Sequence, residues 1–339
     1  MTQIVIFFFL SLIAYIGVFL IRRWVVRDQL LDHPNDRSMH STPIPRGGGL
    51  AIVLIVLAAA ILSANETDLT HSLIYIVCGA VIAWMGWWDD IKSLSHKVRF
   101  AVQSIVAIIS IMGMGYFKSV TIPLIGELQL GAVGIVITFF WIVGLTNAYN
   151  FMDGIDGMAG GVGLAAGLGW MSLSYASGHW GNSFAFWVAL SITAGNLGFL
   201  GHNWPPAKIF MGDVASTFLG YSFAVLSLLS ADKGGDALML GTLLMWVFIM
   251  DAGLTFLSRL IKGEKVFSAH RSHLFQRLVI GGYTHSTVSS LYVVLTLFAG
   301  ILSYAWSRGN QIAAPFIFLG LPLIWIFLSR HAARLKNAD

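Results

Sequence analysis

The chain has 339 residues, of which 57% are hydrophobic and 11% are charged, and its formal net charge is +4. A soluble domain is about one quarter charged, so this composition excludes a soluble globular fold and indicates a protein embedded in lipid. The basic residues lie between apolar runs and form no stripe with interleaved aromatic residues, which excludes a nucleic-acid-binding protein.

Apolar runs recur along the whole chain. A spanning helix needs about 20 mainly apolar residues, and this criterion predicts ten or eleven membrane-spanning helices. The eleven runs are 4–21, 48–63, 72–88, 100–116, 132–149, 159–177, 184–200, 214–231, 237–257, 288–306 and 312–329. The expected fold is therefore an all-α integral membrane protein with one polytopic domain over residues 1–339. Arginines follow the first run rather than precede it, so we expect a retained span, not a cleaved signal peptide.

Basic residues are distributed unevenly between the two sets of loops. With the N-terminus outside, one set of loops holds 17 of the 20 Lys and Arg residues, and the other has only Lys118, Lys233 and Arg308. Because basic loops remain in the cytoplasm, we predict a periplasmic N-terminus and a cytoplasmic C-terminus. The one longer outside connection, 117–131, is predicted to form a small β-hairpin.

The first cytoplasmic stretch with a notable pattern is 37–49, which ends in Pro43-Ile-Pro45-Arg46 and three glycines. Glycine N–H groups can approach a bound anion, or the glycines can begin a tightly packed span. Both alternatives are open at this point.

Two adjacent aspartates, Asp89 and Asp90, end the span 72–88. They repel each other and stand at a helix C-terminus, where the helix dipole disfavours negative charge. A divalent cation or basic partners in a substrate site would relieve both costs. The alternative is a solvated turn with Lys92 and Lys97 as counter-charges.

A second cluster has polar residues at every third position: Asn147, Asn150, Asp153 and Asp156. These four side chains cannot share one helical face, because each step of three residues drifts by roughly 60°. A glycine follows each aspartate, which indicates an irregular turn at the membrane surface. Two amides and two acids predict a site for a cation and a hydrogen-bonding ligand, although Asp-Gly-x-Asp-Gly also occurs in ordinary turns and calcium loops.

A third stretch, 202–216, has two prolines that fix an extended entry to the next span. Asp213 stands where the span 214–231 begins, so it could be an ordinary helix N-cap. The functional alternative is a further acidic group on the cytoplasmic face, joined by Lys208 as a phosphate partner.

The longest basic loop carries His270, Arg271 and His273. An arginine between two histidines suits phosphate or sugar hydroxyl groups, with contact to lipid headgroups as the alternative. A zinc site would need more ligands, and the only cysteine lies in a span. Asp251, an acid inside a span, is left out of the predicted site because it could pair with Arg259 or a polar neighbour.

These five stretches, in this order and on one face, resemble the polyprenyl-phosphate N-acetylhexosamine-1-phosphate transferases of glycosyltransferase family 4, which include WecA, WbpL and MraY. The resemblance covers about residues 37–277. It rests on Pro-x-Pro-Arg-Gly-Gly, the double aspartate followed by Lys97-Val98-Arg99, Asn-x-x-Asn-x-x-Asp-Gly-x-Asp-Gly and Phe-Met-Gly-Asp. The family's histidine motif usually has adjacent histidines. Here it reads His270-Arg271-Ser272-His273, like the WbpL-type branch, which disfavours the peptide-bearing substrate of MraY.

The resemblance implies a Mg²⁺-dependent enzyme, with Mn²⁺ as a substitute, in the bacterial inner membrane. Such an enzyme transfers a 2-acetamido-sugar 1-phosphate from a UDP-sugar to undecaprenyl phosphate and releases UMP, the first step of O-antigen or related surface-glycan synthesis. The sugar and the assembly state, with a homodimer among the options, stay open. The alternatives are an MraY-type phospho-N-acetylmuramoyl-pentapeptide transferase and a secondary transporter for an anionic solute, whose site would lie near the midplane.

The resemblance also implies roles for individual residues. The implied catalytic residues are Asp89, Asp90, Asp153, Asp156 and His270. The implied metal ligands are Asp213, Asp156 and Asp89. The implied substrate-binding residues are Asn147, Asn150, Asn203, Lys97, Lys208, Arg46, Arg271 and His273.

Overall fold

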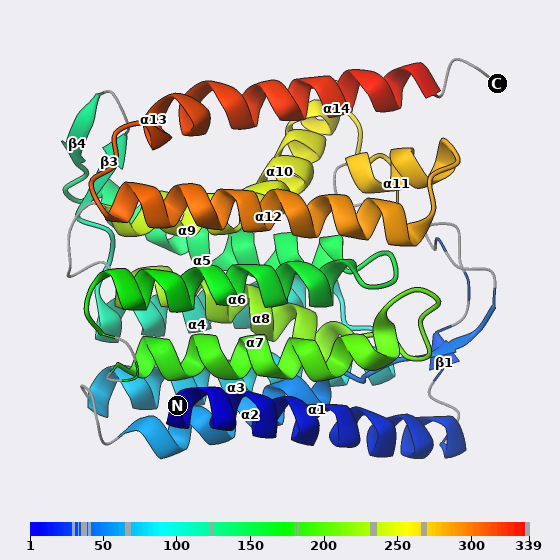
Figure 1. Cartoon of the computed structure of the whole chain (residues 1–339). Coiled ribbons are helices and arrows are strands. Elements are labelled where there is room, and N and C mark those ends of the chain that lie inside the picture. Colours follow the sequence, from blue (N-terminus) through cyan, green and yellow to red (C-terminus); the bar gives the residue numbers. More distant parts are fainter. Residues whose placement is uncertain are drawn as a thin grey trace.

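The computed structural model of the chain describes residues 1–28, 31–32, 34, 39, 42–64, 69–122, 125–179, 181, 183–230, 236–265 and 270–335. Long helices lying side by side dominate this part of the chain (Figure 1). The expected all-α membrane architecture is confirmed. In the stretch 37–49, Arg37 and His40 lie outside the described residues.

Every predicted apolar run lies on one helix or on a broken rod of helices. The helices in the first half are α1 (Thr2–Arg27), α2 (Leu50–Ser63), α3 (Leu69–Lys92), α4 (His96–Met114), α5 (Val133–Met152) and α6 (Met158–Ala176). The second half contains α7 (Phe184–Asn203), α8 (Asp213–Leu229), α9 (Asp236–Leu244), α10 (Trp246–Ile261), α11 (Leu274–Ile280) and α12 (His285–Ser307). The last rod consists of α13 (Ala313–Pro315), the π-helical turn η3 (Phe316–Gly320) and α14 (Leu321–Leu335).

Length and composition support fewer spans than the sequence predicted. Among the described residues, seven helices are long and apolar enough to cross a membrane: α1, α3, α4, α5, α7, α12 and the rod Ala313–Leu335. The pair α9–α10 would be an eighth. α2 and α8 have only 14 and 17 residues, and α6 is rich in glycine. The chain is a multi-pass membrane protein, but the count of eleven spans is not established by this criterion.

The predicted span 237–257 is not one straight helix. α9 and α10 meet at an angle of 83°, and the break falls at Met245, whose φ of −110° and ψ of 10° leave helical geometry. Irregular backbone at membrane depth is tolerated where protein covers it, and Met245 is buried. α10 therefore crosses the other helices obliquely (Figure 1).

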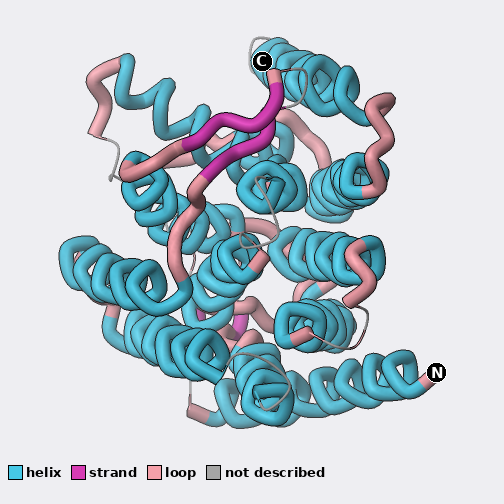
Figure 2. Tube along the Cα trace, turned by 90° about the vertical axis from the view of Figure 1, so that its left-hand side faces the viewer, coloured by secondary structure: helices cyan, strands magenta, loops and turns pink. Residues whose placement is uncertain are grey.

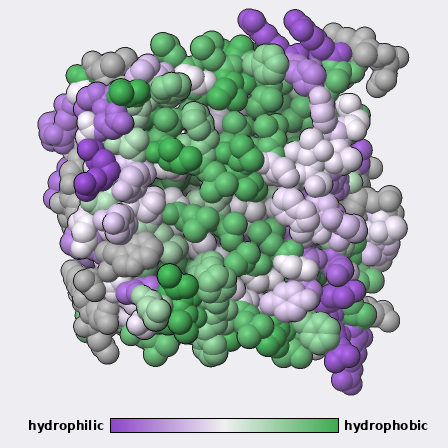
Figure 3. Space-filling view, viewed as in Figure 1, coloured by the Kyte–Doolittle hydropathy of each residue, from purple (hydrophilic) through white to green (hydrophobic). Residues whose placement is uncertain are grey.

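The two ends of the bundle differ. The predicted hairpin is confirmed as β3 (Ser119–Ile122) paired antiparallel with β4 (Gly126–Gln129), and Figure 2 shows it from its own end of the molecule. The opposite end carries a second, unpredicted pair, β1 (Leu31–Asp32) and β2 (Ile44–Pro45). An apolar band separates the more polar ends (Figure 3), as expected for a protein surrounded by lipid.

Helix packing places α8 in contact with α3 and α5, and α6 in contact with α7 and α12. The close approach of α3 to α8 depends on Gly86, because a Cβ there would lie 2.3 Å from the backbone oxygen of Asp213. Small residues permit such close helix contacts in membranes. This contact brings the double aspartate against the first turn of α8.

Candidate active site

The N-terminus of α8 is capped by a residue from another helix. Asp90 Oδ1 accepts the N–H of Asp213 at 2.9 Å, and its Oδ2 accepts the N–H of Val214 at 3.0 Å. The positive end of the α8 dipole therefore offsets the unfavourable position of Asp90 at the end of α3. The alternative that Asp213 is the N-cap is wrong. Gly212 occupies that position with a φ of 83°, and a Cβ there would lie 2.7 Å from Asp90 Oδ2.

The glycines after Arg46 pack against the segment before α8 and do not form an open anion-binding loop. Gly48 and Gly49 donate their N–H groups to the carbonyl oxygens of Phe210 and Met211 at 3.0 and 2.9 Å. A Cβ on Gly49 would lie 2.2 Å from the Cβ of Ala215, so only glycine fits there. The pairing places Arg46 beside Asp90, with Nε 3.7 Å from Oδ1 and Nη2 donating to the Asp90 carbonyl oxygen.

Asp89 has partners that its sequence neighbours did not suggest. Its Oδ2 forms an ion pair with Arg99 Nη1 at 2.9 Å, and its Oδ1 accepts the Leu94 N–H at 2.6 Å. Both aspartates are nearly buried, with 6% and 7% exposure, so the alternative of a solvated turn is wrong. Lys97 is exposed, and Lys92 lies over the ring of Trp88. Arg99 was quoted in the motif but missed as a site residue.

Asp213 lies between an amide and a second carboxyl group. Its Oδ1 accepts a hydrogen bond from Asn150 Nδ2 at 2.7 Å, and the same amide nitrogen reaches Ser216 Oγ at 2.9 Å. The carboxyl group of Asp89 lies beside that of Asp213. Two carboxylates in such proximity favour a shared proton or a bound cation.

Asn147 is directed differently from Asn150. Its Nδ2 donates to Gln103 Oε1 at 2.6 Å, and Gln103 Nε2 donates back to Asn147 Oδ1 at 3.4 Å. The amide thus joins α5 to α4. The substrate contact of Asn147 stays a prediction.

The loop between α5 and α6 holds two aspartates in different environments. Within the described part of the chain, the Asp153 side chain forms no hydrogen bond or ion pair, and only its backbone N–H is bonded, to the Asn150 carbonyl oxygen. Burial, together with the charges of Asp213, Asp32 and Asp156, raises the pKa of Asp153 to about 7. A carboxyl group without a partner, beside other carboxyl groups, is available to a ligand or a cation.

Asp156 is held by two partners. Its Oδ2 accepts the Ala207 N–H at 2.9 Å, and its Oδ1 lies 3.3 Å from His285 Nδ1 at the start of α12. Burial alone would raise the pKa of Asp156, but the contacts with His285 and Ala207 bring this pKa below its usual value. His285 was missed from the sequence, where an isolated histidine at a helix start carries no pattern.

Asn203 fastens two loops together. Its Oδ1 accepts the Gly157 N–H at 3.0 Å, and its Nδ2 donates to the carbonyl oxygen of Ile209 at 2.9 Å. Both ends of the Asn203 amide are therefore hydrogen-bonded to backbone groups, so Asn203 positions these two loops. Lys208, on the same loop, is exposed at the surface.

Asp251, which was not included in the site predicted from the sequence, organises the histidine motif. Asp251 of α10 accepts the N–H groups of Leu274 and Phe275, at 2.7 and 3.2 Å, and the hydroxyl of Tyr292 at 2.6 Å. Its Oδ1 is also 3.3 Å from His273 Nδ1. Asp251 thus caps α11 and fixes the adjacent histidine, and the signal for it was an acid inside a span.

His270 lies next to His273, with ring centroids 4.9 Å apart, and Arg271 between them is exposed. Burial and the neighbouring His273 lower the pKa of His270 to about 4. A Cβ on Gly154 would lie 2.6 Å from the ring of Phe275, so α11 packs against the Asp153 loop. The histidine motif and the acidic loop are therefore neighbours.

The described residues contain no group of three or more His, Cys, Asp or Glu side chains already close enough to hold a metal ion. Proteins usually bind Mg²⁺ through one or two carboxylates and substrate phosphates. The Asp89–Asp213 pair, with Asp153 nearby, offers such a donor set. Asp156, the remaining predicted ligand, already forms an ion pair with His285 and accepts a hydrogen bond from the Ala207 N–H.

The chain matches the family model described as glycosyl transferase family 4 over residues 72–231. It is 33% identical to a probable undecaprenyl-phosphate N-acetylglucosaminyl 1-phosphate transferase of Bacillus subtilis, over 88% of this chain and 84% of that protein. It is 33% identical to a decaprenyl-phosphate N-acetylglucosaminephosphotransferase of Mycobacterium leprae, over 87% of this chain and 80% of that protein. An undecaprenyl-phosphate alpha-N-acetylglucosaminyl 1-phosphate transferase of Yersinia pestis is 30% identical, over 92% of this chain and 85% of that protein.

Proposed function

The chain belongs to glycosyl transferase family 4, and from this premise we propose that it transfers N-acetylglucosamine 1-phosphate from UDP-N-acetylglucosamine to undecaprenyl phosphate. The products are undecaprenyl-diphosphate-N-acetylglucosamine and UMP. The related proteins are named as transferases of N-acetylglucosamine 1-phosphate to polyprenyl phosphates, which supports this acceptor class and this sugar and does not favour an MraY-type donor or a transporter.

One observation carries the proposal: Asp89, Asp213, Asp153 and Asn150 come together at one end of the bundle, from three separate segments. The reaction joins a lipid phosphate to a nucleotide diphosphate, so two anions must approach each other. Such a reaction is limited by charge and by alignment rather than by covalent chemistry. A site at a membrane surface, with carboxylates and nearby arginines, meets both needs.

We assign the residues separate tasks. Asp89 and Asp213 would hold Mg²⁺ or Mn²⁺, which when bound neutralises phosphate oxygens. Arg99 and Asn150 keep these two carboxylates in place. Asp153, whose pKa is raised to about 7, exchanges a proton near neutral pH and so adjusts the charge of the site as substrates enter.

The other motif residues position or contact substrate. Asp90 fixes the first turn of α8, and Asp156 with Asn203 fixes the loops around it. His270 is neutral near pH 7 because its pKa is lowered to about 4, so it would recognise the diphosphate or sugar by hydrogen bonding rather than by charge. Lys97, Lys208 and Arg271 are exposed cations able to attract the nucleotide.

The proposal includes an orientation. The site lies at the end where the basic loops gather, so we place it on the cytoplasmic face of the bacterial inner membrane, with the β3–β4 hairpin in the periplasm. We also keep all eleven apolar runs, including α2, α6 and α8, within the membrane. The product would begin O-antigen or a related surface glycan.

The test is UMP release by the purified protein with undecaprenyl phosphate, Mg²⁺ and a panel of UDP-N-acetylhexosamines. We expect Mg²⁺-dependent UMP from the N-acetylglucosamine donor, and none from Asp213→Asn. Asp28→Asn is the matched control, because Asp28 is an exposed aspartate outside the site. Near-normal turnover by Asp213→Asn would refute the metal assignment. Solute uptake by proteoliposomes without UMP formation would refute the proposed reaction.

A further inference from the structure

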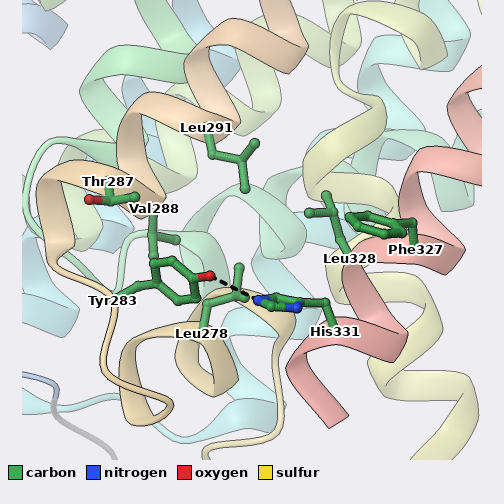
Figure 4. A pocket seen from close by; sticks show the side chains of 8 residues that line it. All are labelled: Leu278, Tyr283, Thr287, Val288, Leu291, Phe327, Leu328 and His331. Atoms are coloured by element: carbon green, nitrogen blue, oxygen red, sulfur yellow. Dashed lines mark hydrogen bonds between the residues drawn. The ribbon is translucent and has the colours of Figure 1, made fainter. Parts of the chain in front are cut away.

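A pocket of about 340 Å³ lies between α11, α12 and α14 (Figure 4). Its walls are mainly apolar, with Leu278 from α11, Val288 and Leu291 from α12, and Phe327 and Leu328 from α14. Val288 and Leu291 lie near the start of α12, and Leu328 and His331 lie in the second half of α14, at the end of the bundle that carries the acidic site. The pocket thus lies at one membrane surface, at the small end of the range of about 300–1,000 Å³ typical of ligand sites.

The rim of the pocket is polar on one side. Tyr283 Oη and His331 Nε2 lie 2.8 Å apart and form the hydrogen bond drawn in Figure 4. Phe327, His331 and Arg334 follow one another at helical spacing on α14, so the exposed Arg334 lies on the face that lines the pocket. Arg330 adds a second exposed cation one turn before Arg334.

The described elements that line the pocket contribute no acidic side chain to offset these cations. The sequences of α11, α12 and α14, and of the connection 281–284, contain neither Asp nor Glu. The rim is therefore basic, while the interior is apolar. This combination suits a molecule with a hydrocarbon chain and a negatively charged head, placed where a membrane surface presents such molecules.

We propose that this pocket binds an acyl chain of an anionic bilayer phospholipid, with the lipid phosphate held by Arg334 and His331. The small volume accepts part of one chain, not the long isoprenoid of the acceptor substrate. The pocket is also separate from the Asp89–Asp213 pair, which is built where α3 packs against α8.

The bound lipid would support two elements of the active site. Leu278 belongs to α11, whose N-terminal cap is His273, and Arg277 Nη2 of α11 donates to the Ser329 carbonyl oxygen of α14 at 3.0 Å. Tyr283 stands two residues before His285, the partner of Asp156. A chain filling the pocket would therefore hold α11 and the start of α12 in place. This consequence for activity rests on the proposed function, whereas the binding itself does not.

The test uses the full-length protein and two lipids, phosphatidylglycerol and phosphatidylcholine. Lipid retention is measured by native mass spectrometry for the wild type, Arg334→Gln and Leu291→Trp, which fills the pocket. Arg308→Gln and Leu297→Trp are the matched controls, because Arg308 is an exposed cation at the opposite end and Leu297 is an exposed leucine on α12. We expect Arg334→Gln to weaken phosphatidylglycerol binding about five-fold, the loss expected for one basic residue near an anionic surface. Leu291→Trp should reduce binding further, and neither control should change it.

Three results would overturn the proposal: equal retention of phosphatidylglycerol by all variants, equal binding of the two lipids by the wild type, or displacement of phosphatidylglycerol by undecaprenyl phosphate. The exposed Arg334→Gln keeps the test valid if Leu291→Trp does not fold. UMP release in bilayers of each lipid is measured in parallel, and phosphatidylglycerol should increase it for the wild type and the two controls, and less for the two pocket variants. A complete lack of UMP in both lipids would count against the proposed function, while the binding data would still decide the pocket.

Discussion

Removing the Asp90 carboxylate should destabilise the protein more than removing that of Asp213. Asp90→Ala leaves the N–H groups of Asp213 and Val214 without their acceptors in a partly buried first turn. An unsatisfied buried donor costs about 1–3 kcal/mol, so the two together lower the free energy of unfolding by about 2–6 kcal/mol. Asp90→Asn retains one carbonyl oxygen and should lose about half of this amount.

The predicted contrast is with Asp213→Asn. Asp213 Oδ1 accepts only from Asn150 among the described residues, and the same carboxyl group faces that of Asp89. Replacing it by an amide removes a negative charge from a crowded cluster, so the free energy of unfolding should stay the same or increase. Activity should be lost in both Asp90→Ala and Asp213→Asn, for different reasons.

The only cysteine of the chain makes the assay direct. Cys78 is buried in α3, so a thiol-reactive fluorophore reports its exposure as the protein unfolds on heating. The expected order of unfolding temperatures is Asp90→Ala, then Asp90→Asn, then wild type, with Asp213→Asn at or above wild type. If Asp90→Ala unfolds at the wild-type temperature, or if Asp213→Asn is destabilised equally, the assignment of Asp90 as the cap of α8 is wrong.

Three further predictions concern the loops around the acidic site. Because the pKa of Asp153 is raised to about 7, this group is mostly protonated at about pH 6 and ionised at about pH 8, so the apparent Mg²⁺ affinity in UMP assays should rise with pH across this window and become flatter in Asp153→Asn. His285→Ala removes the partner of Asp156 and should reduce turnover roughly ten-fold or more, with a smaller loss in His285→Gln, because a hydrogen bond to a charged group contributes about 1.5–3 kcal/mol. Gly154→Ala should lower the free energy of unfolding by about 1–3 kcal/mol through overpacking against Phe275.

For each of these predictions, a specific result would contradict the reasoning. The same pH dependence of Mg²⁺ affinity in wild type and Asp153→Asn would contradict the role given to Asp153. Equal turnover in His285→Ala and wild type would mean that the Asp156 contact does not position the loop. Phe275→Leu should partly restore the stability of Gly154→Ala. Strictly additive losses in that double variant would argue against the contact.

The architecture could be predicted well because lipid leaves the backbone few choices. Every N–H and C=O at membrane depth needs a partner, so an apolar run becomes a helix whatever its neighbours are. The eleven predicted runs lie on helices for this reason, and the β3–β4 hairpin was predicted from the strand-forming residues on either side of its turn. The break at Met245 could not be predicted, because an apolar run looks the same whether its helix is straight or bent.

The sequence by itself determined the chemical inventory of this protein: a membrane bundle, a basic face, and acids and amides gathered in the loops of that face. Only the tertiary structure decided the partners. Adjacent Asp89 and Asp90 bind different groups, Arg99 for one and the N-terminus of α8, 123 residues away, for the other. Asp251 proved to organise the histidine motif rather than pair with Arg259. Composition and spacing fix which side chains reach one face, but hydrogen bonds and charges act over a few ångströms, and such distances are set by how the helices pack.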